Sequence, residues 1–140
     1  MSGTFDQIAA FVAQPEVPDS ARRMAARLLV DTLGVAAGAM HLEPAVIARN
    51  FAVDFHGASS AQNAAHLLFD GREVSVPGAA FAAATQIDNL DGHDGYNPTK
   101  GHIGCAVVPA LLAFAEAHPE LSSIEALDIL AKSYEIGARA

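Results

Sequence analysis

The sequence is poor in several residue types, and each shortage restricts what the protein can be. Cys105 is the only cysteine, tryptophan is absent, and aromatic residues make up 6% of the 140 positions. A single cysteine cannot form an intrachain disulfide, which fits a reducing compartment. Positive charge is also scarce, with 8 basic against 16 acidic residues and a formal net charge of −8. Nucleic acid is therefore not expected as a partner, because phosphate backbones are bound by basic faces.

Long uninterrupted apolar runs are missing as well. The longest one is broken by Arg27, Asp31 and several glycines, whereas a membrane span needs about 20 consecutive apolar residues. The N-terminus has no basic segment leading into an apolar core, so no secretion signal is indicated. Neither a Walker pattern, a GxGxxG pattern nor a GxSxG elbow occurs. We expect a cytoplasmic protein with no membrane partner.

The residues that are present favour closely packed helices. Hydrophobic residues make up 51% of the chain and charged residues 17%, which is typical of a folded domain with a real core. Alanine dominates the apolar share, and small side chains let helices approach one another. Apolar residues recur at helical spacing, predicting helices over about 4–13, 18–40, 44–55, 77–90, 106–118 and 122–140. We expect an all-α domain with at most one short β-hairpin, at Asp70-Gly71.

Two helix boundaries carry specific predictions. Ser122 and Glu125 have the spacing of a capping box, so a helix should begin there. Pro109 is tolerable in a helix only near the first turn. The last helical pattern reaches Ala140 without a glycine or proline stop. We therefore interpret residues 1–140 as the N-terminal part of a helical domain in a longer polypeptide.

Acidic and basic residues gather in one loop, "DNLDGHDGYNPTKGH", residues 88–102. Asp88 and Asp91 are three apart and would share a helix face if the preceding helix extends that far. A helix C-terminus and a neighbouring carboxylate both disfavour a negative charge. Asp88 and Asp91 are therefore candidates for general acid or base catalysis.

The other end of this loop has the opposite polarity. His102 lies just before the next helix, where the helix dipole disfavours the imidazolium form. The backbone amides of Ile103, Gly104 and Cys105 would point toward an anion at that helix N-terminus. Lys100 could add a positive charge. The pattern predicts a place for a substrate carboxylate.

Plainer interpretations of the loop stay open. Taken singly, His93, Asp94 and Lys100 are typical of solvated loop residues, and Cys105 of a small core residue. Asp88 is harder to dismiss, because its alanine-rich helix is predicted to be buried. Together Asp91, His93, Asp94 and His102 could hold a metal, but their spacing matches no HExxH, CxxC or EF-hand pattern. We predict no metal site.

Three stretches of the chain form a recognisable series: "LLVDTLGVAAGA" (28–39), "PGAAFAAATQIDNLD" (77–91) and "GHIGCAVVPALLAFAE" (101–116). In this order they resemble the MmgE/PrpD family, which includes 2-methylcitrate dehydratase, cis-aconitate decarboxylase and iminodisuccinate epimerase. The resemblance implies catalytic roles for Asp88, Asp91 and His102. With the reasoning above, it places His93, Lys100 and Gly104 at the substrate.

The resemblance also implies a wider architecture and chemistry. These enzymes move protons beside carboxylates of di- and tricarboxylic acids without a metal or organic cofactor. A second α+β domain and a homodimer are implied, with a small polycarboxylate as substrate. The loop is longer here than is usual, and Ile103 and Gly104 replace a Pro-Ser pair. Dehydration is the expected reaction, with decarboxylation, epimerisation or a non-catalytic helical subunit as alternatives.

Overall fold

A computed structural model describes residues 3–139. Within them lie six α-helices: α1 (Thr4–Val12), α2 (Asp19–Ala39), α3 (Glu43–Phe55), α4 (Val76–Asp88), α5 (Gly104–Ala117) and α6 (Ser123–Arg139). Two short 3-10 turns, η1 (Ala61–Asn63) and η2 (Asn97–Thr99), accompany them. The four strands are β1 (Ala64–His66), β2 (Glu73–Ser75), β3 (Gly95–Tyr96) and β4 (Gly101–His102). The predicted all-α class is confirmed.

The strands form two small antiparallel pairs. β1 pairs with β2, with Ala65 opposite Val74, around the predicted turn at Asp70-Gly71. The second pair, β3 with β4, was not expected, and it lies inside the polar loop with Gly95 opposite His102. Lys100 adopts a left-handed conformation, with φ of 55°, where the chain turns back between these strands. The polar loop is thus a hairpin and not an open connection.

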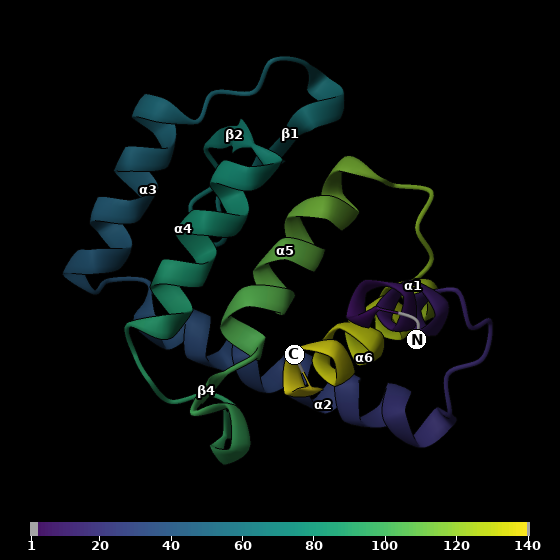
Figure 1. Cartoon of the computed structure of the whole chain (residues 1–140). Coiled ribbons are helices and arrows are strands. Elements are labelled where there is room, and N and C mark those ends of the chain that lie inside the picture. The colour runs from purple at the N-terminus through teal and green to yellow at the C-terminus, as the bar shows by residue number, and fades with distance from the viewer. Residues whose placement is uncertain (1–2, 140) are drawn as a thin grey trace.

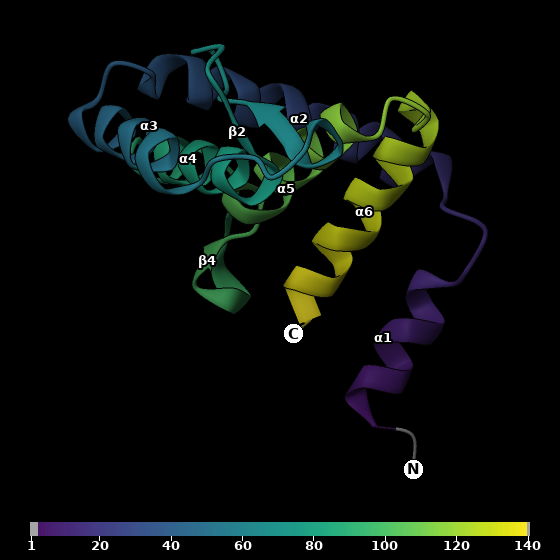
Figure 2. The ribbon, with the colours of Figure 1, turned by 90° about the horizontal axis from the view of Figure 1, so that it is seen from above.

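The helices α3, α4 and α5 lie side by side, and α2 crosses behind them (Figures 1 and 2). Alanine makes this close packing possible, because a methyl group keeps two backbones near one another. The core between these helices and the β1–β2 pair is formed by small side chains with a few larger ones: Ala48, Ala52, Ala65, Leu67, Val74, Ala79, Ala82 and Ala113. The layer fixes how the end of α4 meets the start of α5.

A buried polar network ties α2, α3 and α4 together. Gln86 on α4 is 1% exposed, and its Nε2 donates to the carbonyl of Ala36 on α2 at 2.7 Å. Arg49 on α3 donates from Nη1 to Gln86 Oε1 at 2.6 Å and from Nη2 to the Met40 carbonyl at 2.7 Å. Buried polar groups are costly unless they are paired, so these bonds define one arrangement of the three helices.

A second core joins α2, α5 and α6 around Ala25, Val108, Leu111 and Leu130. The predicted capping box starts α6: Glu125 accepts from the Ser122 amide at 3.0 Å, and Ser122 Oγ accepts from the Glu125 amide at 3.3 Å. Helix α1 buries none of its residues. No single helix in the described residues is long and apolar enough to cross a bilayer, although the bent pair α2–α3 passes that test jointly.

Two helix ends differ from the sequence prediction. Helix α5 begins at Gly104, two residues early, so Pro109 falls in its second turn and not in the first. Its ring is fully buried, and packing there compensates for the missing amide hydrogen bond. Helix α4 ends at Asp88 and not at Leu90. The early end of α4 changes the placement of the loop acids.

Candidate functional site: an acid–histidine cluster

The loop between α4 and α5 gathers a set of side chains that we call the acid–histidine cluster: Asp88, Asp91, His93, Asp94, His102 and Cys105. Ligand-type atoms of His93, Asp94 and His102 lie within 4.8 Å of one another, as do those of Asp88, His93 and Cys105. His93 belongs to both groups. The cluster therefore connects the C-terminal end of α4 to the N-terminal end of α5.

Asp91 pairs with His102 and not with Asp88. His102 Nε2 lies 2.9 Å from Asp91 Oδ1, with the His102 side chain 27% exposed and that of Asp91 78% exposed. Asp91 follows the end of α4 in a left-handed conformation, with φ of 51°, so the expected shared helix face with Asp88 is wrong. A carboxylate only accepts hydrogen bonds, so Nε2 carries the proton. The lone pair of neutral His102 is then on Nδ1, which is buried without a partner.

His93 is the most enclosed member of the cluster. It is 7% exposed, which contradicts the expectation of a solvated loop residue. Its ring centroid lies 4.3 Å from that of His102, and neither ring nitrogen has a hydrogen-bond partner. Burial, followed by the neighbouring His102, lowers the pKa of His93. His93 is therefore a neutral imidazole with an available lone pair at neutral pH.

Asp94 occupies the helix N-terminus that the sequence suggested for a substrate carboxylate. Its Oδ2 and Oδ1 accept from the Gly104 amide at 3.1 and 3.2 Å. The Gly104 amide is thus bound to protein, and the prediction that it faces a substrate anion is not met in this arrangement. A Cβ at Gly104 would lie 2.5 Å from the Tyr134 hydroxyl and 2.6 Å from Asp94 Oδ1. Glycine is required there by close approach.

Asp88 stands at the other side of the cluster. It is the last residue of α4 and is exposed, whereas the sequence suggested a buried position.

The Cys105 sulfur lies 3.0 Å from the His102 carbonyl. Burial, and then the adjacent Asp88 carboxylate, raise the pKa of Cys105 to about 11. Cys105 is a protonated thiol at neutral pH and not a nucleophile.

Lys100 is not held against the other charged groups. It is exposed, and its Nζ donates to Asn97 Oδ1 at 2.7 Å. Among the described residues no ion pair joins Lys100 to the acid–histidine cluster. Its predicted role beside a substrate therefore requires the side chain to leave Asn97.

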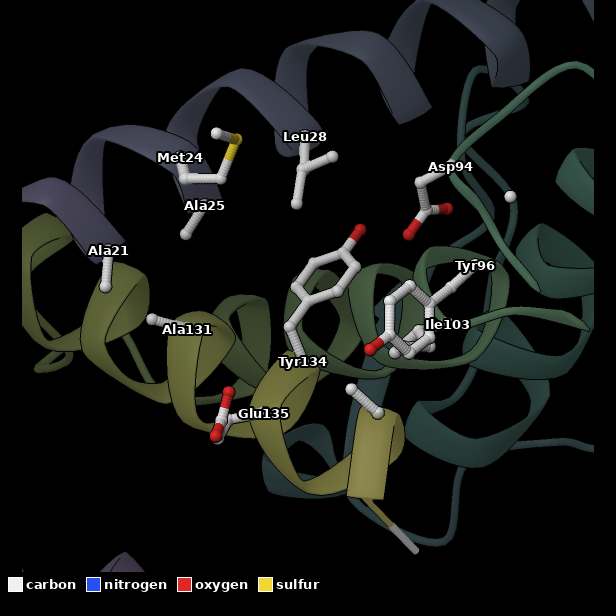
Figure 3. A pocket seen from close by; sticks show the side chains of 12 residues that line it. Ala21, Met24, Ala25, Leu28, Asp94, Tyr96, Ile103, Ala131, Tyr134 and Glu135 are labelled. Atoms are coloured by element: carbon white, nitrogen blue, oxygen red, sulfur yellow. The ribbon is translucent and has the colours of Figure 1, made fainter. Parts of the chain in front are cut away.

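A groove of about 420 Å³ runs beside the cluster, between α2, α6 and the β3–β4 hairpin. The Tyr134 hydroxyl points toward the Asp94 carboxylate in this groove (Figure 3). Burial and the Asp94 charge raise the pKa of Tyr134 above its ordinary value. The remaining lining is mostly apolar, including Met24, Leu28 and Ile103, and contains no lysine or arginine. The groove suits the apolar part of a ligand, and Asp94 is its link to the cluster.

Sequence reasoning underrated Asp94 and overlooked Tyr134. The sequence predicted a helix start at residue 106, so it did not show that α5 begins at Gly104 after Ile103, whose side chain has no oxygen to cap a helix. Nothing in the local sequence connects Tyr134, thirty residues downstream of Gly104, to the loop. Only the packing of α6 against α2 and α5 brings it there.

The fold and the site define a helical domain with an acid–histidine cluster at the junction of two helices. The sequence profile of the MmgE/PrpD N-terminal domain matches residues 6–140. The chain belongs to the MmgE/PrpD family, as the N-terminal domain. Comparisons with curated proteins and with solved structures give no significant match. Family membership supports a lyase-type enzyme without identifying the substrate.

Proposed function

We propose that this domain supplies the proton-transfer groups of a cofactor-independent lyase acting on di- or tricarboxylic acids. The expected reaction is water elimination of the 2-methylcitrate dehydratase type. The observation that carries the proposal is the Asp91–His102 pair, 2.9 Å apart, with the unpartnered Nδ1 of His102 turned into the protein. This is how a carboxylate orients a histidine base.

In this mechanism the substrate displaces the side chains that now enclose His102 Nδ1, and Nδ1 removes the proton from the carbon beside a substrate carboxylate. The electron pair of that C–H bond forms the C=C bond, and the C–O bond to the departing hydroxyl breaks. Asp88 takes up a proton and gives it to that hydroxyl, which leaves as water. Asp91 stabilises the imidazolium of His102. Proton return from His102 to Asp88 through solvent restores the site.

Substrate binding requires positive charge from outside the cluster. A di- or tricarboxylate is repelled by Asp88, Asp91 and Asp94, and the groove beside them contains no lysine or arginine. Lys100 is the nearest candidate in the sequence. We propose that further cationic groups come from a second α+β domain, within a homodimer. The 140-residue chain alone should therefore be inactive.

Two alternatives share parts of this proposal. Decarboxylation and epimerisation use the same carboxylate-adjacent chemistry and differ in the bond broken next. A non-catalytic helical subunit is favoured by one observation, the occupation of the Gly104 amide by Asp94. A scaffold, however, has no need for a histidine whose base nitrogen is kept free.

The test uses this domain together with its proposed second domain. The protein is incubated with a 2-methylcitrate-like acid, and the products are identified by NMR. They distinguish loss of water, loss of carbon dioxide and inversion of a stereocentre. Asp88→Asn should lower turnover by orders of magnitude at an unchanged melting temperature. Asp54→Asn, at an exposed position of α3, is the matched control. Full activity in Asp88→Asn would support the non-catalytic alternative.

A further inference from the structure

The acid–histidine cluster has the charge of a cation site. Asp88, Asp91 and Asp94 supply three carboxylates, and the described residues place no lysine or arginine in an ion pair with them. The two imidazoles add no charge in their neutral forms. Neutral imidazole and carboxylate are together a common ligand set for divalent transition-metal ions.

His93 gives the independent reason to expect a ligand. It is 93% buried, since its exposed fraction is 7%, and both of its ring nitrogens lack a hydrogen-bond partner. A buried polar group without a partner is costly. A metal ion would use the free lone pair of His93. Potential ligand atoms from Asp94 and His102 lie within 4.8 Å of it.

The geometry of His102 fits coordination in a second way. Its Nε2 is bound by Asp91 at 2.9 Å, and its Nδ1 is buried and free. Metal-binding histidines usually hold their other ring nitrogen against a carboxylate, which fixes the ring and raises its basicity. Asp91 would be that outer carboxylate. His93, Asp94 and His102 would then be the three ligands, and Asp91 would orient His102.

From these observations we infer that His93, Asp94 and His102 bind a divalent transition-metal ion of the Zn²⁺ class, with Asp91 orienting His102. Tetrahedral zinc ligands lie about 3.3 Å apart at ordinary bond lengths. Binding therefore draws the three side chains slightly together. Asp94 retains oxygen lone pairs for the ion while capping Gly104, because each carboxylate oxygen accepts more than one bond.

The ion is a competitor of the proposed reaction and not its cofactor. It occupies the His102 lone pair that the proposed function uses to remove a proton, so it should inhibit. Metal binding is nevertheless measurable on the 140-residue chain without turnover. A chain that binds no metal could therefore still be a lyase, and a chain without lyase activity could still bind the metal.

The test titrates chelator-treated chain with Zn²⁺ by calorimetry and with Co²⁺ by visible absorption. One ion per chain should bind. His93→Gln and His102→Gln should each weaken binding at least tenfold. Asp91→Asn should weaken it about 10- to 100-fold, the usual effect of losing an outer carboxylate. Asn tolerates the left-handed conformation of Asp91, so this exposed variant should fold. The control is His118→Gln, a surface histidine beside Glu120.

Three results would overturn the assignment. The first is the absence of Zn²⁺ binding, and the second is unchanged affinity in His93→Gln and His102→Gln. The third is a sulfur-to-cobalt charge-transfer band that disappears in Cys105→Ala, because it would place the ion with Asp88, His93 and Cys105 instead. A Co²⁺ spectrum without that band, unchanged in Cys105→Ala, supports the proposed ligands.

Discussion

The Asp94 carboxylate caps the backbone amide of Gly104, ten residues further along the chain. This contact closes the β3–β4 hairpin against the start of α5. His93 directly precedes Asp94, and His102 lies two residues before Gly104. The capping contact therefore sets the spacing of the two histidines as well as the beginning of the helix.

Asp94→Ala should destabilise the domain by about 0.5–2 kcal/mol, the usual effect of losing a helix N-cap. Chemical denaturation checks this value. The released hairpin should also be cut faster by a protease, because its anchor on α5 is lost. Asp54→Ala, on the exposed surface of α3, should change neither measurement. Unaltered stability in Asp94→Ala would show that the cap is dispensable.

Two glycine-to-alanine changes should have opposite effects. Gly104→Ala places a methyl group 2.5 Å from the Tyr134 hydroxyl and 2.6 Å from Asp94 Oδ1, so we expect a loss of about 1–3 kcal/mol from overpacking. Gly34→Ala, inside α2, meets nothing within 4 Å and should stabilise by up to about 1 kcal/mol. Thermal denaturation of both variants and the wild type measures these changes. If the Gly104→Ala and Gly34→Ala variants had equal melting temperatures, the close approach of Tyr134 and Asp94 to Gly104 would be contradicted.

Arg49→Met should be among the most destabilising changes, at about 3–5 kcal/mol, because it breaks a buried charged network. It leaves Gln86 Oε1 and the Met40 carbonyl without their donor. Arg139→Met, whose side chain is 79% exposed beside Glu135, should leave stability nearly unchanged. Urea denaturation compares the two. A small effect at Arg49 would mean that the network adapts without it.

Asp70 predicts how stability depends on pH. Hydrogen bonds from Arg72, with a contribution from the Arg49 charge, lower the pKa of Asp70 below its ordinary value of 3.8. A lowered folded-state pKa stabilises the fold fully above pH 3.8, and this stabilisation is lost as pH falls through the lower, folded-state value. Asp70→Asn should therefore cost about 1–3 kcal/mol at pH 7. The difference from wild type should shrink below about pH 4.

Urea denaturation of both proteins between pH 2 and 7 measures that difference, with the range set by the lowered pKa of Asp70. Comparing the two proteins removes the contribution of the other acids, which titrate in both. A difference that stays constant down to the acid limit would contradict the assignment of Asp70.

Much of the fold could be read from the sequence because its signals are local. Ser122 and Glu125 mark the start of α6, and Asp70-Gly71 marks the β1–β2 turn, through contacts within a few residues. The end of α4 was missed because Asp88 to Leu90 continue a helical pattern. The left-handed Asp91 that follows turns the chain toward His102.

The site was less predictable because burial depends on the whole fold. His93 stands between glycine and aspartate in a polar loop, and nothing local shows that it is enclosed. Its burial follows from the β3–β4 hairpin folding onto α5. Asp94 has two neighbours from distant parts of the chain, Gly104 and Tyr134. Helix packing brings these two residues to Asp94. The sequence places Asp88, Asp91 and His102 in one candidate site, but it does not show that His102 pairs with Asp91 and that Asp88 stays apart.

The central claim is that His102, oriented by Asp91, removes a proton from a carbon beside a carboxylate. It is tested most directly by incubating this domain, together with its proposed second domain, with a 2-methylcitrate-like acid in D₂O and following deuterium incorporation at that carbon by NMR. Wild-type protein should catalyse exchange or elimination. His102→Gln should slow both by roughly 10²–10⁴-fold, the contribution of a general base, while the His118→Gln control keeps the wild-type rate. Wild-type exchange in a folded His102→Gln protein would contradict the account.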